Sequence, residues 1–219
     1  MNHMDSHRLS QVAPLEDAPD EMVTMMALRL IDEMSRRDPL TYAHSERVAR
    51  ISVGIGTELR FSKSDLEDLR VSAMLHDIGK IAVIGSLLSK TEQLSSKEFG
   101  WVKSHAELGH ALLSNIPGLE RFALVARWHH ERWDGTGYPD RLEAEATPLP
   151  ARVVALADSV DVMLNGRHYQ KARDPREVII EVRRSMGTHF DPLTVNALMS
   201  AWMGGLLPGF EDTQSLKSV

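Results

Sequence analysis

The chain has 219 residues, of which 42% are hydrophobic and 26% charged, the composition of an ordinary globular domain that is long enough to bury a core. Its formal net charge of −6 argues against a broad nucleic-acid-binding face, so duplex nucleic acid is not an expected partner. Because the chain has no membrane-length apolar run, no signal-peptide pattern and no cysteine, it is expected to insert in no membrane, to form no disulfide and to reside in the cytoplasm.

The chain is predicted to begin with a tail followed by two helices. Residues 1–20 mix polar residues without periodicity, which predicts a flexible N-terminal tail. A helix is predicted over residues 20–37, and Thr41 is predicted to cap a second one. In the second helix, His44 precedes Val48 by four residues and shares its apolar face, so its ring is expected to point at the core.

The next helices bring further polar residues to the inside. A third apolar stripe ends at Ala73, and His76 continues it three residues later. Residues 85–96 are predicted to form a loop, and a helical stretch is predicted around residues 105–113. Another helix is predicted to begin near Leu119 and to deliver the pair His129-His130 at its C-terminal end.

The rest of the chain also reads as helices and loops. A long loop is predicted over residues 135–147, followed by a helix that places Asp158 on a small-residue face. Two Asp-Pro pairs, at 174–175 and 191–192, are helix-start signals. With no convincing alternating strand segment, the prediction is an all-α domain over residues 21–205, followed by a C-terminal tail over 206–219.

Seven inward side chains on five helical segments are candidate metal ligands: His44, His76, Asp77, His105, His129, His130 and Asp158. Seven ligands are too many for one zinc ion and suit two octahedral ions with a bridging carboxylate. Imidazole with carboxylate and no sulfur favours iron or manganese, with zinc, nickel or cobalt as alternatives. The cofactor prediction is therefore two divalent metal ions in the core of the bundle, which indicates hydrolytic chemistry.

A single inward histidine is usually a hydrogen-bonded core residue, so no one of these positions is decisive. The adjacent pairs His76-Asp77 and His129-His130 differ, because burying them without a metal would need many compensating hydrogen bonds. Asp161, one turn after Asp158, is open to capping or pairing instead of ligation. Lys80 follows the His-Asp pair closely enough to reach a metal-bound phosphate.

Two strings carry a family resemblance: His76-Asp77-x-Gly79-Lys80 and His129-His130-Glu131-x-x-Asp134-Gly135-x-Gly137-Tyr138-Pro139. With them the chain resembles the HD-GYP domain, a branch of the HD phosphohydrolase superfamily, over roughly residues 22–203. The second string is interpreted as a lip of the site, with Tyr138 expected to stack on a partner or base. Further likeness lies in Thr41-x-x-His44-Ser45-x-Arg47-Val48, His105-x-Glu107-x-Gly109, Ala151-Arg152, Asp158-x-x-Asp161, Arg167-x-Tyr169 and 187–192.

The resemblance implies an HD-domain helical bundle with a binuclear or trinuclear metal centre, often iron. It implies hydrolysis of cyclic di-GMP to pGpG, and often onward to GMP, by attack of a metal-bridging hydroxide. The seven candidates would be the ligands, with Asp77 bridging and, together with Lys80, serving as a catalytic residue. Lys80 and Arg167 would contact the substrate phosphates.

The chain departs from the family pattern at several positions. Leu40 stands where trinuclear members carry a glutamate, which favours two metals over three. Gln170 replaces a common basic residue, and its neighbour Lys171 is predicted as a substrate contact instead. In the lip, Arg141 and Ala144 replace the usual glycines, which predicts a stiffer or differently shaped loop.

Two alternatives to the leading function stay open. One is a weakly active or inactive signalling module that binds a cyclic dinucleotide or a GGDEF-domain partner. The other is a phosphodiesterase for another cyclic dinucleotide, such as cyclic GMP-AMP. Family members usually carry a receiver or sensor domain, and only about twenty residues precede the first helix, so the chain is expected to act alone or with a regulator such as a receiver-domain protein on a separate chain. An oligomer is compatible with either reading.

Overall fold

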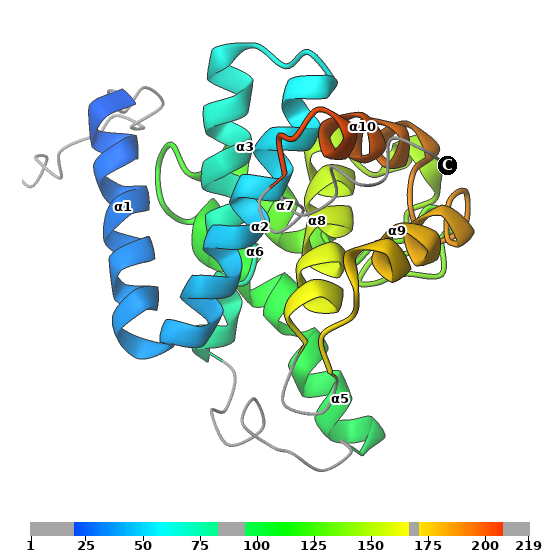
Figure 1. The fold of residues 1–219 in the computed structure, drawn as a ribbon. Helices are drawn as coiled ribbons and strands as arrows, with labels where there is room; N and C mark the ends of the chain where they lie inside the picture. Colours follow the sequence, from blue (N-terminus) through cyan, green and yellow to red (C-terminus); the bar gives the residue numbers. More distant parts are fainter. Residues whose placement is uncertain (1–19, 83–94, 167–170, 208–219) are drawn as a thin grey trace, which may run out of the picture.

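The protein is an all-helical bundle in a computed structural model that describes residues 20–82, 95–166 and 171–207. Figure 1 shows α2 (Pro39–Glu58) and α8 (Leu149–Asn165) side by side in the middle of the bundle, with most of the other helices around them. Within the described ranges the only β features are two isolated bridges, so the all-α prediction is confirmed. No helix among these residues is both long and apolar enough to cross a membrane. The predicted tails lie largely outside these ranges, and the domain boundaries stay predictions.

The elements follow one another in the order α1 (Asp20–Arg37), α2 (Pro39–Glu58), α3 (Lys63–Leu75), η1 (Ile78–Ala82), α5 (Ser96–Lys103), α6 (His105–Ser114), α7 (Glu120–Trp128), η2 (Ala144–Ala146), α8 (Leu149–Asn165), α9 (Pro175–Arg184) and α10 (Pro192–Met203). Helix α2 packs against α1, α3, α8 and α10. Its buried residues Val48, Ile51 and Ile55 belong to the same core cluster as Val153 and Val160 of α8. This core forms the floor on which the candidate site is built.

The start of α2 differs from the prediction, because Asp38 rather than Thr41 is the N-cap. The Asp38 carboxylate accepts hydrogen bonds from the main-chain N–H of Thr41 at 3.0 Å and from its hydroxyl at 2.6 Å. Pro39 follows as the first helical residue, where its missing N–H costs nothing. The same Asp-Pro signal was correctly identified at Asp174 and Asp191, both of which cap their helices.

Helix α5 was not predicted. The expected loop over residues 85–96 lies mostly outside the described residues, and its last residue is already the first of α5. Ser95 and Glu98 form a capping box, in which the Ser95 hydroxyl accepts from the Glu98 N–H and the Glu98 carboxylate accepts from Ser95. This Ser-x-x-Glu pattern is visible in the sequence and could have revealed the helix.

A close backbone contact fixes the short helix η1 against α6. A side chain at Gly79 would place its Cβ only 2.0 Å from the carbonyl oxygen of His105 and 2.5 Å from the N–H nitrogen of Gly109. Only glycine allows the two segments to approach this closely. The contact therefore holds Asp77, which precedes Gly79, and Lys80, which follows it, opposite His105 of α6.

Candidate metal centre

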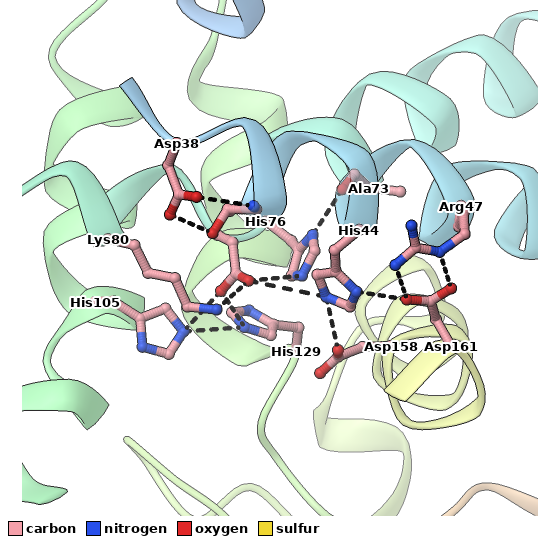
Figure 2. A network of polar contacts seen from close by, with 12 residues as sticks. Asp38, His44, Arg47, Ala73, His76, Lys80, His105, His129, Asp158 and Asp161 are labelled. Carbon is pink, nitrogen blue, oxygen red and sulfur yellow. Dashed lines mark hydrogen bonds and ion pairs between the residues drawn. The ribbon is translucent and has the colours of Figure 1, made fainter. Parts of the chain in front are cut away.

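The seven predicted ligand side chains come together in the interior of the bundle. His44 comes from α2, His76 and Asp77 from the end of α3, His105 from the start of α6, His129 and His130 from the end of α7, and Asp158 from α8. Figure 2 shows the rings of His44, His76, His105 and His129 pointing toward one another. Five of the seven residues are buried, and His44 and His130 are half-buried.

The candidate donors fall into two groups, each able to hold one ion. The first consists of His44, His76 and Asp77, and the second of His105, His129 and His130. Within each group the ligand atoms lie within 4.8 Å of one another. Asp158 lies beside the first group, with its Oδ1 atom 3.0 Å from His44 Nε2.

Asp77 belongs to the first group but also faces the second, and it presents one oxygen to the histidines of each group. Its Oδ2 atom is 3.4 Å from His76 Nε2 and 3.9 Å from His44 Nε2. Its Oδ1 atom is 3.3 Å from His105 Nε2 and 3.9 Å from His129 Nε2. A carboxylate placed in this way can bridge two cations, because its two oxygens face different donor groups.

Hydrogen bonds on the far side of the rings fix which nitrogen faces the centre. In His76, His105 and His129, Nδ1 donates to a main-chain carbonyl three residues earlier, at 2.7, 2.6 and 3.0 Å. Since a carbonyl can only accept, Nδ1 carries the hydrogen in each ring. In the neutral ring the Nε2 lone pair is then directed at the centre, which is the arrangement of metal-ligating histidines.

The Nε2 atoms of the second group lie so close to one another that neutral rings, without a cation between them, would repel each other. His105 Nε2 lies 3.2 Å from His129 Nε2 and 3.2 Å from His130 Nε2. With Nδ1 protonated in His105 and His129, two lone pairs face each other, and a shared cation would remove the repulsion. Two nitrogens bound to one ion at Zn–N distances of about 2.1 Å lie about 3.0–3.4 Å apart at octahedral or tetrahedral angles.

The electrostatic environment keeps the second group neutral. Burial lowers the pKa of His105 and His129, and burial also lowers the pKa of His130 to about 3. Burial opposes a charge on His44 as well, but two neighbouring aspartates outweigh it and raise the pKa of His44 to about 9. A neutral imidazole is the form that binds a metal, and His44 in the acidic group would exchange its proton for a cation.

Several buried polar atoms of the cluster have no hydrogen-bond partner among the described residues. They include His44 Nε2, His76 Nε2 and Asp77 Oδ1. Buried polar groups are normally satisfied, so these orphaned atoms point to a missing electropositive partner. Nitrogen and oxygen donors without sulfur fit a divalent cation of intermediate hardness.

Lys80 lies at the edge of the first group, with its ammonium in contact with Asp77 Oδ2. Burial raises the pKa of the Asp77 carboxyl, but Lys80 and His76 outweigh it and hold this pKa well below its usual range. Asp77 is therefore an anion at neutral pH, as a bridging ligand must be. The Lys80 side chain keeps 16% of its surface exposed, so it can reach a ligand that enters from solvent.

The predicted lip, which begins after His130, folds back over the end of α7. The Tyr138 ring stacks on the His130 ring at a centroid distance of 4.7 Å and an interplanar angle of 25°. Gly137 allows this fold, because a Cβ there would lie 2.5–2.7 Å from main-chain atoms of 130–132. Tyr138 thus contacts a candidate ligand directly, and its predicted substrate contact stays a prediction.

Glu131 has a structural role that the sequence did not reveal. Its carboxylate is buried and accepts hydrogen bonds from the N–H groups of Asp140 at 2.7 Å and Leu142 at 3.2 Å. It therefore ties the lip to the end of α7. The string of polar residues around it gives no signal of which side chain faces inward.

The structure does not test the two remaining predicted substrate contacts. Arg167 lies outside the described residues, as does Gln170. Lys171 is exposed in the connection between α8 and α9. Leu40, the residue that departs from the trinuclear pattern, is 70% exposed in the first turn of α2 and offers no donor.

Comparisons with known proteins show the family of the chain. The sequence profile of the HD domain matches residues 29–193, so the chain belongs to the HD-domain family. The matched range contains both strings that carry the predicted resemblance to the HD-GYP branch. Among solved structures, an HDG"Y"P protein from Bdellovibrio bacteriovorus shares the fold with a TM-score of 0.64 at 15% identity, over 85% of this chain and 65% of that one.

Two curated relatives are more similar in sequence. The cyclic di-GMP phosphodiesterase response regulator RpfG of Xanthomonas campestris is 38% identical over 78% of this chain and 46% of its own length. The 3'3'-cGAMP-specific phosphodiesterase 3 of Vibrio cholerae is 33% identical over 86% of this chain and 40% of its own length. The chain therefore spans less than half the length of these relatives.

Proposed function

We propose that the chain is a metal-dependent phosphodiesterase that hydrolyses cyclic di-GMP to pGpG. The observation that carries the proposal is the set of histidine Nε2 atoms that converge on Asp77 while their Nδ1 atoms are held by carbonyl groups. Relatives with cyclic dinucleotide phosphodiesterase names support this choice of substrate class.

The residues that would hold the ions are the seven predicted ligands, His44, His76, Asp77, His105, His129, His130 and Asp158. Two donor groups that Asp77 joins support a centre of two divalent ions, and the exposed Leu40 supplies no ligand for a third. The mixed imidazole and carboxylate set favours iron or manganese. When bound, such ions supply Lewis acidity toward a phosphate and make water a stronger acid.

The side chains around the donors have separate tasks in this proposal. Asp77 stays ionised and joins the two groups, while Lys80 next to it places a positive charge where a phosphate would approach. Tyr138 and the lip cover one side of the site. Arg167 and Lys171 are proposed to contact the substrate from the connection that follows α8.

A second candidate substrate is 3'3'-cGAMP, because one relative is named as specific for it. The metal centre acts on the phosphodiester and does not itself distinguish guanine from adenine. Base recognition therefore decides between the two substrates. A competition assay with both dinucleotides in one reaction separates them.

The proposal extends to the cellular setting of the protein. We propose a cytoplasmic location and a receiver-domain or GGDEF-domain regulator. The Xanthomonas relative is named as a response regulator, which supports a receiver-domain partner. Co-purification of the chain with a tagged candidate regulator tests this point.

The function is tested by incubating iron- or manganese-loaded protein with cyclic di-GMP and separating the products by chromatography. We expect pGpG to form with the wild type and not with His76→Ala. His110→Ala is a matched control, since His110 lies on α6 outside the cluster. No linear product from the wild type, with a His76→Ala variant that behaves identically, would overturn the proposal.

A further inference from the structure

Lys103 places a second positive charge near the candidate metal centre. It is the last residue of α5, two residues before the candidate ligand His105. Its Nζ atom lies 4.7 Å from the centroid of the Tyr138 ring and 4.7 Å from that of Phe99. Because Tyr138 stacks on His130, the ammonium is separated from the ligand cluster by a single aromatic ring.

The position of Lys103 depends on two firmly held neighbours. The carbonyl of Val102 accepts the Nδ1 hydrogen of His105 at 2.6 Å, which ties the end of α5 to the metal centre. Tyr138 N–H donates to the carbonyl of His130 at 3.3 Å, which ties the lip to it as well. Lys103 is half-buried between these segments, so its charge has a defined place at the edge of the metal centre next to Tyr138, which we call the rim.

Among the described residues, Lys103 has no acidic partner, unlike several other cations around the site. The others are each paired with a carboxylate: Lys80 with Asp77, Arg47 with Asp161, Arg127 with Asp140, Arg132 with Asp134, and Arg152 with Asp191. Within the described ranges, no carboxylate lies within 4.0 Å of Lys103 Nζ. Aromatic faces attract an ammonium but leave its charge available to an anion.

We propose that Lys103 binds the second phosphodiester of a cyclic dinucleotide, the one that is not being cleaved. The inference rests on the proposed function. A cyclic dinucleotide carries two phosphodiesters, and while one lies at the metal centre beside Lys80, the other must lie toward the rim. An ammonium without an acidic partner at that rim matches the charge of this second phosphate. Phe99 and Tyr138 hold the lysine in place.

The test compares two substrates that differ in the number of phosphates. Cyclic di-GMP has two phosphodiesters, whereas bis(p-nitrophenyl) phosphate has one and reports on the metal centre alone. In Lys103→Gln we expect the KM for cyclic di-GMP to rise about tenfold, which corresponds to the loss of one charge contact. We expect kcat for cyclic di-GMP, and turnover of bis(p-nitrophenyl) phosphate, to stay within about twofold. Lys103→Arg should recover most of the affinity.

Lys97→Gln is the matched control. Lys97 lies on the same helix, and its Nζ atom is 5.1 Å from the ring of Trp101; neither residue belongs to the two donor groups. The KM of Lys97→Gln for cyclic di-GMP should equal that of the wild type. A binding measurement adds a readout apart from turnover: calorimetry with cyclic di-GMP on the inactive His76→Ala background should show weaker binding when Lys103→Gln is added.

The outcomes separate this inference from the proposed function. If the wild type cleaves cyclic di-GMP and Lys103→Gln has an unchanged KM, the assignment of Lys103 is wrong and the proposed function stands. If Lys103→Gln loses activity on both substrates equally, Lys103 acts through the structure of the centre, and the assignment is again wrong. If the wild type cleaves only bis(p-nitrophenyl) phosphate, the proposed function falls and the assignment falls with it.

Discussion

The Nδ1 atom of His44 lies 2.7 Å from the Oδ2 atom of Asp161, although the two residues are 117 positions apart in the chain. Arg47 holds the same carboxylate through Nε at 2.7 Å and Nη2 at 3.0 Å (Figure 2). The contact between His44 and Asp161 keeps the Nε2 atom of His44 directed at Asp77 and Asp158. Asp161 therefore pairs with His44 from outside the donor groups and acts as a positioning residue.

Asp161→Asn should weaken the first donor group without unfolding the protein. The amide keeps the shape of the carboxylate but loses its charge, so it orients His44 less firmly and binds Arg47 less tightly. Loss of such a partner typically lowers metal affinity or activity about 10–100-fold. Metal titration by calorimetry measures the effect. Glu46→Gln, which removes an exposed carboxylate of α2 paired with Arg50, is the control, and equal affinities for the two variants would contradict the role of Asp161.

Metal removal should lower the thermal stability of the protein. A ligand that binds only the folded state at a hundredfold excess over its Kd stabilises it by about 2.7 kcal/mol. For a domain of this size that corresponds to a rise in Tm of about 5–10 °C. Thermal unfolding followed by circular dichroism, with chelator and with added Mn²⁺, measures the difference. His129→Ala should show no such rise, and equal Tm values for wild type with and without metal would argue against a bound ion.

Gly137→Ala should disturb the lip. Its Cβ would lie 2.5 Å from the N–H nitrogen of Arg132 and 2.6 Å from the Cα atom of Glu131, and neither main-chain atom can move freely. We expect the free energy of unfolding to fall by about 1–3 kcal/mol, and kcat/KM to fall with it. Denaturant unfolding measures the first quantity. Gly100→Ala is the control, because nothing lies within 4 Å of its Cβ, and it should be neutral or slightly stabilising.

Lys80→Gln should reduce turnover while leaving the metal in place. Lys80 contacts Asp77 and lies outside both donor groups, so its charge is expected to act on the phosphate and not to hold an ion. Removing one preorganised charge of this kind costs about 10²–10³ in kcat. Steady-state kinetics and elemental analysis of the same sample test both parts. Loss of bound metal in Lys80→Gln would show that Lys80 instead maintains the centre.

The convergence of the site could be predicted because it follows from short-range patterns. His76 continues an apolar stripe of α3, and the pair His129-His130 ends α7, so these residues were expected to face the core. His76 and His129 are buried, and His130 is half-buried. The all-α class follows equally from helical periodicity. The predicted cap of α2 was wrong. Thr41 was preferred over Asp38, although Asp38 precedes a proline.

The remaining features depend on contacts between distant segments. The Nδ1 partner of His44 is on α8, and the cation beside Tyr138 comes from α5, a helix that was not predicted. No local pattern shows that Glu131 turns toward the lip instead of the solvent. These relationships are set by how the helices pack, which sequence periodicity alone does not specify.

A two-ion centre built from seven side chains is tested most directly by counting the bound metal ions. Native mass spectrometry with elemental analysis, on protein loaded with Mn²⁺ or Fe²⁺, gives the number of ions per chain. We predict two ions for the wild type and fewer for His105→Ala, whose ring lies within 3.3 Å of Asp77 and 3.2 Å of two other histidines. A wild type that retains no ion, or an unchanged ion count in His105→Ala, would contradict the account.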